Sequence, residues 1–266
     1  MYTIGNWLNK AENKLKESGI KSAHLDALLL LEFVLHKKRE HLLAHPEIAL
    51  NRPSAERLEK ILEQRCARFP LQYITNNAHF YGRLFYVDSD VLIPRPESES
   101  FINLLLLKQD EFSSLIDVGT GSGVLGITAK LLFPNVKVTC SDIDLAALQV
   151  AKKNARYCKA DIIFKKQPLL DDNNYNVVLA NLPYVPDSIP LINELSYEPA
   201  LALRADDNGM YYYHQLWKKI QSNQFKPIFV LTESLLEQHK DMMRLANESG
   251  YKIESTEGLV QLFAKA

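Results

Sequence analysis

The sequence predicts an α/β protein with a small helical domain at its N-terminus. From residue 114 onward, short β-branched runs alternate with helical segments, which is typical of a sheet with helices on both faces. The first seventy residues show only helical spacing of their apolar residues. Between these two parts lies an aromatic stretch around a Gly turn, which predicts a β-hairpin.

Residues 1–70 are expected to form a helical bundle that recognises a partner. Apolar residues recur at helical spacing in the first helix, and Gly19 supplies a stop. Ser22 is expected to cap a second helix, and a third is expected to begin near Pro53. The histidines of this region are scattered along the sequence, so the pattern predicts no metal site.

Residues 71–95 are predicted to be a linker that contains the hairpin Phe80–Asp88, and residues 96–266 are predicted to be the main domain. Pro94 and Pro96 forbid a regular element and fix an extended loop before a helix that begins near Glu97. Strands are expected at residues 115–118, 136–140, 162–164, 177–180, 228–231, 252–255 and 259–264, and helices at 123–132, 145–157, 209–220 and 235–249.

The composition excludes several classes of protein. A net charge of −1 gives no electrostatic case for binding a nucleic-acid backbone. Three cysteines without metal-like spacing argue against a disulfide framework or a metal centre. No signal peptide is evident, and no apolar run approaches the ~20 residues that span a bilayer. We therefore expect a cytoplasmic protein that binds no membrane.

A glycine-rich turn, Asp117-Val-Gly-Thr-Gly-Ser-Gly123, follows the first predicted strand of the main domain. Glycines allow positive φ and let a ligand approach the backbone, while the N–H groups of the following helix point at it. Asp142 ends the next strand and is placed to bind both hydroxyls of a ribose. The turn therefore predicts a site for a nucleoside-bearing cofactor.

Two cofactor classes remain open for this turn. Gly121–Gly126 satisfies a literal GxGxxG, so a dinucleotide enzyme is one alternative. The carboxylate of Asp117 would repel a pyrophosphate, whereas S-adenosyl-L-methionine has an amino-acid end and a ribose but no phosphate. The two acids, Asp117 and Asp142, therefore favour the methyl donor.

The tetrapeptide Asn181-Leu182-Pro183-Tyr184 lies at the end of the fourth predicted strand, where open α/β sheets place their ligands. The Asn181 side-chain oxygen and the Leu182 carbonyl can accept two N–H bonds from a planar amide or amino group, and Tyr184 can stack on it. Such orientation by fixed dipoles needs no strong general base. The tetrapeptide thus predicts methyl transfer to a planar nitrogen.

Several segments resemble the HemK/PrmC family of release-factor glutamine N5-methyltransferases over nearly the whole chain. The matching segments are Leu92-Ile-Pro-Arg-Pro-Glu-Ser-Glu99, the glycine turn, Asp142, Asn154, Asn181-x-Pro-Tyr184 and Tyr197-Glu-Pro-Ala-Leu-Ala-Leu203. The resemblance implies a class I, Rossmann-like methyltransferase domain with a seven-stranded sheet. It also implies a substrate, the glutamine of the Gly-Gly-Gln motif in class 1 peptide chain release factors, and Phe80 as part of the glutamine pocket.

The sequence departs from the family pattern at several positions. Leu182 replaces a Pro, which leaves the carbonyl in place and removes about 1 kcal/mol of preorganisation. No acid for the adenine amino group is evident near Pro168, Asn176 replaces an Asp, and the C-terminal charge pattern is reduced to Glu257-Gly258. An N6-adenine methyltransferase, another protein-glutamine methyltransferase and a catalytically weak binding protein of the same fold remain alternatives.

The predicted site has three parts, and we expect a monomer without a metal. The donor site is expected to comprise Asp117, Gly119, Thr120, Gly121, Ser122, Gly123, Asp142, Ile143, Leu169 and Asn181. The catalytic residues are expected to be Asn181, Leu182, Pro183 and Tyr184, and the substrate is expected to contact Phe80, Asn181, Pro183 and Tyr184.

Overall fold

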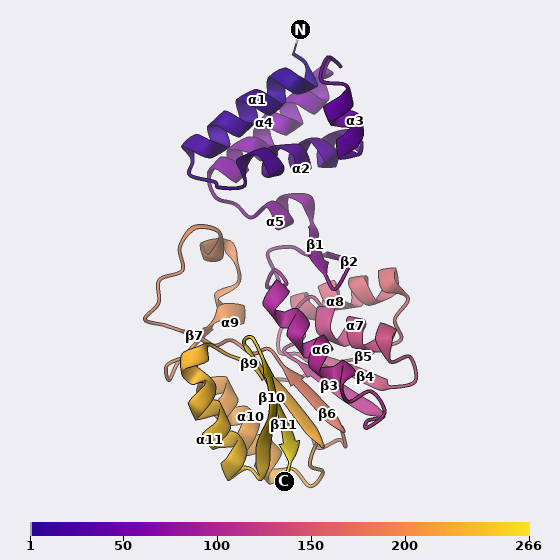
Figure 1. The fold of residues 1–266 in the computed structure, drawn as a ribbon, viewed down its shortest axis with the longest axis vertical. Coiled ribbons are helices and arrows are strands. Elements are labelled where there is room, and N and C mark those ends of the chain that lie inside the picture. Colours follow the sequence, from indigo (N-terminus) through magenta and orange to yellow (C-terminus); the bar gives the residue numbers. More distant parts are fainter. Residues whose placement is uncertain (1) are drawn as a thin grey trace. The chain divides into compact units, whose positions relative to one another are not determined.

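The computed structural model describes residues 2–266, which form two compact units (Figure 1). The first unit runs to Asn76 and also contains Ile192–Tyr197, a segment that lies far along the sequence from the rest of that unit. The second unit comprises Asn77–Leu191 and Glu198–Ala266, so the β-hairpin belongs to it.

The first unit is helical, as its spacing predicts. Its helices are α1 (Ile4–Glu17), α2 (Ala23–Leu35), α3 (Arg39–Ala44), α4 (Arg52–Cys66) and α5 (Leu71–Thr75), together with the short η2 (Asn193–Tyr197). Trp7, Leu31 and Leu62 are fully buried in the shared core. Ser22 occupies the N-cap position of α2 as expected, but its backbone is not extended and its side chain makes no capping hydrogen bond. Asn51 does cap α4 through the Ser54 N–H.

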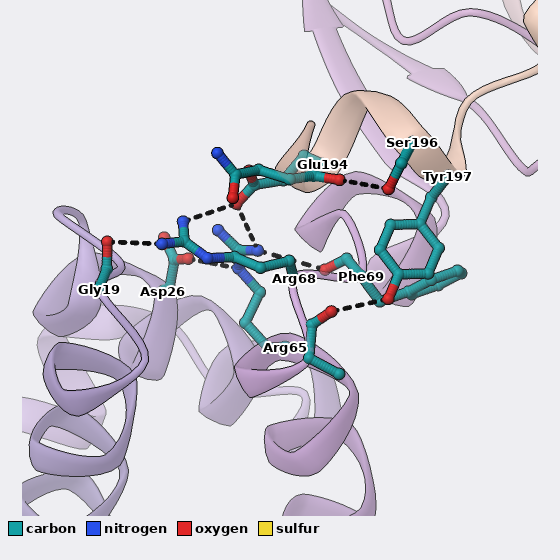
Figure 2. Close-up of polar contacts among 10 residues, drawn as sticks. Gly19, Asp26, Arg65, Arg68, Phe69, Glu194, Ser196 and Tyr197 are labelled. Atoms are coloured by element: carbon teal, nitrogen blue, oxygen red, sulfur yellow. Dashed lines mark hydrogen bonds and ion pairs between the residues drawn. The ribbon is translucent and has the colours of Figure 1, made fainter. Parts of the chain in front are cut away.

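The segment Ile192–Tyr197 is held to α4 by polar contacts (Figure 2). The buried guanidinium of Arg65 donates to Asp26 at 2.7 Å through Nε and to Glu194 at 2.9 Å through Nη1. The Tyr197 hydroxyl donates to the C-cap carbonyl of α4 at 2.7 Å. Arg65 therefore joins three parts of the first unit that are distant in sequence.

The second unit is built on a seven-stranded sheet with the order β10-β11-β9-β6-β3-β4-β5. Its strands are β3 (Ser114–Val118), β4 (Lys137–Asp142), β5 (Ile163–Lys166), β6 (Val177–Ala180), β9 (Phe229–Glu233), β10 (Tyr251–Glu257) and β11 (Val260–Lys265). Strands β5, β4, β3, β6 and β9 run parallel, whereas β11 pairs antiparallel with both β9 and β10. The predicted seven-stranded Rossmann-like sheet is confirmed.

Helices cover both faces of this sheet (Figure 1). One face packs against α6 (Ser100–Leu106), α7 (Val124–Leu132) and α8 (Leu145–Cys158), and the other packs against α10 (Tyr211–Ser222) and α11 (His239–Glu248). The smaller elements are β1 (Asn77–Phe80), β2 (Arg83–Tyr86), η1 (Pro96–Glu99), β7 (Val185–Pro186), α9 (Ala200–Leu203), β8 (Arg204–Ala205) and η3 (Leu236–Gln238). None of the helices in residues 2–266 has both the length and the apolar character needed to cross a membrane.

The strand order reverses at β3, which pairs with β4 on one side and β6 on the other. In open α/β sheets this reversal leaves a crevice at the carboxyl ends of the strands. The chain continues from β3 into the glycine turn, β4 ends at Asp142, and β6 leads directly into Asn181. The sheet topology therefore brings the three predicted site segments to one edge.

Candidate active site

A cavity of about 340 Å³ lies at this edge of the second unit, at the small end of the usual size range for ligand sites. Residues from all three strand ends line it, together with the loop before α6. The predicted residues that line it are Asp117, Gly119, Thr120, Gly121, Ser122, Asp142, Ile143, Leu169, Asn181, Leu182 and Pro183. Most of the residues predicted from separate motifs thus share one cavity.

The glycine turn takes a conformation that its residue types explain. Gly121 has φ +52°, and a Cβ on it would meet nothing within 4 Å, so this side of the turn is open. Gly123 has φ +84°, and a Cβ there would come within 2.9 Å of the Ile127 side chain and 3.1 Å of Ala151. Gly121 therefore keeps space in the cavity, whereas Gly123 does not line it and allows α7 and α8 to pack closely.

Asp117 stabilises the conformation of the glycine turn. Its carboxylate is 1% exposed, and Oδ2 accepts from the Thr120 hydroxyl at 2.5 Å and from the Gly126 N–H at 3.0 Å. Burial raises the pKa of Asp117 to about 6. Because both of these hydrogen bonds go to one oxygen, the other oxygen is left for a cationic or hydroxyl group in the cavity.

Asp142 is fixed at the end of β4 by the backbone around it. Its Oδ2 accepts from the Gly121 N–H and its Oδ1 from the Asp144 N–H, each at 2.9 Å. Burial raises the pKa of this carboxyl as well. The carboxylate therefore lies beside the glycine turn with lone pairs available to further donors.

The cavity fits S-adenosyl-L-methionine and does not fit a dinucleotide. Its lining has four carboxylates, Asp90, Asp117, Asp142 and Asp144, whereas its single cation is Arg95. Arg95 is already paired with Glu198 at 2.5 Å, so no free positive charge of the described lining faces a pyrophosphate. Ile143 and Leu169 add apolar surface next to Asp142, where a nucleobase can pack.

The tetrapeptide presents two acceptors at the cavity. The Asn181 amide nitrogen donates to the Ser98 hydroxyl at 2.9 Å, and its Oδ1 accepts nothing from the described residues. The Leu182 N–H donates to the buried hydroxyl of Tyr213 at 3.2 Å, a bond that a Pro at this position could not make. The loss of the Pro ring is therefore offset by a hydrogen bond from the main chain.

Two residues predicted to contact the substrate, Phe80 and Tyr184, do not line the cavity. Phe80 is fully buried in the core, with its ring 6.4 Å from that of Phe85, and does not line the cavity. Tyr184 does not line it either, and its hydroxyl donates to Glu233 at 2.9 Å. The contacts give Phe80 a packing role and give Tyr184 a polar anchor, so their binding of substrate stays a prediction.

Arg95 lines the cavity and Glu198 holds it in place, although neither was predicted as a site residue. Glu198 is 5% exposed, and its carboxylate accepts from the Ile93 N–H at 2.9 Å and from Arg95. These bonds tie the proline-rich loop before η1 to the segment that follows Tyr197 in sequence. Both residues lie in segments that resemble the family, residues 92–99 and 197–203, but only the fold shows that they form an ion pair.

Comparison with known protein families finds two models that match this chain. The PrmC N-terminal domain matches residues 6–75, and the methyltransferase small domain matches residues 98–193. A release factor glutamine methyltransferase of Coxiella burnetii is 31% identical over 87% of this chain and 86% of its own length. The relative thus resembles both parts of the chain.

Two further similarities concern a longer protein and a solved structure. A bifunctional methyltransferase of Rickettsia bellii is 31% identical over 80% of this chain, which spans only 45% of that relative. The chain spans about half the length of this relative and of two others from Rickettsia species. The crystal structure of a methyltransferase from Pyrococcus furiosus has a TM-score of 0.52 at 15% identity, covering 80% of this chain and 99% of that one, which supports the fold alone.

Proposed function

The chain belongs to the HemK/PrmC family of release factor glutamine methyltransferases, and from this premise we propose that it methylates the side-chain amide nitrogen of the glutamine in the Gly-Gly-Gln motif of class 1 peptide chain release factors. The observation that carries the proposal is the pair of acceptors at the cavity. Asn181 Oδ1 accepts from none of the described residues, and the Leu182 carbonyl, 3.4 Å from the Tyr213 hydroxyl, is farther from it than the Glu233 carbonyl that takes its one hydrogen, so both oxygens can accept from a planar NH₂ group.

These acceptors act on the amide by orientation. The nitrogen of an amide is a weak nucleophile because its lone pair is delocalised into the carbonyl. Two fixed acceptors hold both N–H bonds and thereby aim the nitrogen, and a preorganised geometry of this kind supplies several kcal/mol of barrier reduction. The proton that the nitrogen loses on methylation passes to solvent.

The other end of the cavity is suited to the donor. S-Adenosyl-L-methionine supplies an electrophilic methyl group on a sulfonium sulfur. Asp142 would bind the ribose hydroxyls, Asp117 would bind the amino group, and Ile143 with Leu169 would pack on the base. No carboxylate from the Pro168 region lines the cavity within the described residues, so the base is expected to be held by packing and main-chain contacts.

The choice of a protein substrate is supported by the family and by the charge of the chain. A net charge of −1 offers no attraction to a nucleic acid, which is the substrate of the N6-adenine alternative. We propose that the protein acts as a monomer in the cytoplasm, and light scattering after gel filtration that gives the mass of two chains would contradict this.

The function is tested by incubation with labelled methyl donor and a release factor, in wild-type and Gln→Ala forms of the Gly-Gly-Gln motif. The expected result is label on the wild-type factor and none on the Ala form. Label that persists on the Ala form, or that enters only DNA, would overturn the proposal. Donor binding without any transfer would instead favour the binding-protein alternative.

A further inference from the structure

We propose that Glu233, the last residue of β9, is a positioning residue that fixes the direction of the Asn181 amide through Ser98, and so makes the site select an amide over a carboxylate. The inference rests on the proposed function and deepens it, because it concerns how the same cavity recognises its substrate. Glu233 does not itself line the cavity, whereas Ser98 and Asn181 do.

Glu233 is a buried carboxylate with a hydroxyl donor on each oxygen. It is 1% exposed, its Oε2 accepts from the Ser98 hydroxyl at 2.6 Å, and its Oε1 accepts from the Tyr184 hydroxyl at 2.9 Å. Burial raises its pKa, and hydrogen bonds from Ser98, Tyr184 and Asn181 oppose that rise. A buried charge is costly unless its lone pairs are satisfied, and here its neighbours satisfy them.

The carboxylate sets the direction of the whole chain of hydrogen bonds. The two oxygens of Glu233 accept from the Ser98 and Tyr184 hydroxyls, so the single hydroxyl hydrogen of Ser98 points to Glu233. The Ser98 oxygen can then only accept from Asn181, which turns the NH₂ group of that amide toward Ser98. Asn181 Oδ1 is consequently left facing away from Ser98 as an acceptor, the polarity that a substrate NH₂ group requires.

The main chain of Glu233 supports the second acceptor in the same way. Tyr213 is fully buried in α10, and the Glu233 carbonyl is the nearest of three carbonyls around its hydroxyl, ahead of Ala180 at 3.3 Å and Leu182 at 3.4 Å. With its one hydrogen donated to Glu233, the hydroxyl accepts from the Leu182 N–H. The Leu182 carbonyl is thereby left free, so both acceptors of the tetrapeptide are oriented from the end of β9.

The test compares Ser98→Ala with Ser234→Ala. Ser234 follows Glu233 and is fully buried, but its hydroxyl has no hydrogen-bond partner among the described residues, so its loss removes an equivalent group without touching the network. For each variant we would measure kcat and KM for the release factor, Kd for the donor, and inhibition by a release factor with Gly-Gly-Glu. Glu233→Met, which removes both acceptors at similar volume, is the second variant.

We expect Ser98→Ala to lower kcat on the order of tenfold to a hundredfold, with donor Kd unchanged, because the amide is no longer held in one direction. The Gly-Gly-Glu factor, a poor inhibitor of the wild type, should inhibit Ser98→Ala, since a rotated Asn181 amide presents NH₂ to the substrate carboxylate. Glu233→Met should shift the inhibition in the same direction, and Ser234→Ala should match the wild type.

The proposal would be overturned if Ser98→Ala is inhibited by the Gly-Gly-Glu factor no more strongly than the wild type, relative to its KM for the Gly-Gly-Gln factor. It would also be overturned if Ser234→Ala loses as much activity as Ser98→Ala. Failure of the proposed function is recognised separately, by NMR of the Asn181 side-chain NH₂ group without any substrate. If the wild type transfers no methyl to a release factor, slow hydrogen exchange of this NH₂ group that becomes fast in Ser98→Ala still supports the positioning role. Equal exchange in both proteins contradicts it.

Discussion

Replacement of Asp117 by Asn removes a buried charge and keeps the hydrogen bonds around it. The hydrogen bonds that this side chain accepts, from the Thr120 hydroxyl and the Gly126 N–H, reach the same oxygen, Oδ2. The carbonyl oxygen of an Asn can take that place, and its NH₂ group then occupies the position of Oδ1 at the cavity. The variant therefore isolates the cost of the charge from the loss of its partners.

The size of the effect follows from the pKa of Asp117, which burial raises from 3.8 to about 6. Between these values the folded protein holds a proton that the unfolded chain has released, so the free energy of unfolding falls as pH rises. This stabilisation is complete below pH 3.8 and is lost as pH rises through about 6. Above pH 6 the ionised carboxylate costs about 3 kcal/mol relative to its neutral form.

Urea unfolding of the wild type and of Asp117→Asn between pH 5 and pH 8 measures this cost. Burial also raises the pKa of Asp142 and of Glu233, and both proteins share these groups. The charge of Asp142 adds to the rise in the pKa of Asp117, so the measured cost includes this repulsion. We expect the variant to gain about 1.4 kcal/mol of stability relative to the wild type between pH 5 and pH 8, about half of the total of about 3 kcal/mol, since the rest is lost below pH 5. Asp161→Asn, at an exposed carboxyl, controls for net charge. Parallel pH profiles of wild type and Asp117→Asn would refute the reasoning.

Three further predictions concern the donor, the tetrapeptide and the first unit. Asp142→Asn should weaken donor binding by about tenfold to a hundredfold, since one charged acceptor for the ribose is lost; unchanged affinity by calorimetry would argue against its role. Tyr213→Phe should cost about 1–3 kcal/mol of unfolding free energy by leaving the Leu182 N–H buried and unpaired, and clearly less in a Leu182→Pro background; equal costs in a urea double-mutant cycle would contradict the bond. Arg65→Met should destabilise the chain by about 3–5 kcal/mol because its buried aspartate partner loses its counter-ion, whereas Glu194→Gln should cost about 1 kcal/mol or less. Similar urea midpoints for both variants would contradict the roles assigned to the two ion pairs of Arg65 in Figure 2.

The sequence predicted the parts of this protein that depend on local patterns. The alternation of strands and helices gave the sheet, and the order of glycine turn, Asp142 and tetrapeptide placed three segments that the sheet brings to one cavity. Such segments are predictable because parallel strands share one carboxyl edge, whatever the details of packing.

The parts that could not be predicted depend on contacts between distant residues. Nothing local distinguishes Ser98 or Glu233 from ordinary polar residues, because their role arises from a hydrogen bond across 135 positions. The replacement at Asn176 likewise becomes clear only in the fold, where its side-chain oxygen accepts from the N–H groups of Ser113 and Ser114. Phe80 shows the converse, since an aromatic residue expected at the site is used by the core.

The most direct test of the central claim is the position of the transferred methyl group. A release factor that has been incubated with the protein and S-adenosyl-L-methionine can be digested and its Gly-Gly-Gln peptide fragmented by tandem mass spectrometry. The site described here predicts one methyl group on the side-chain amide nitrogen of that glutamine, and none when Asn181 is replaced by Ala. A methyl group on any other residue of the factor, or undiminished methylation by Asn181→Ala, would contradict the account.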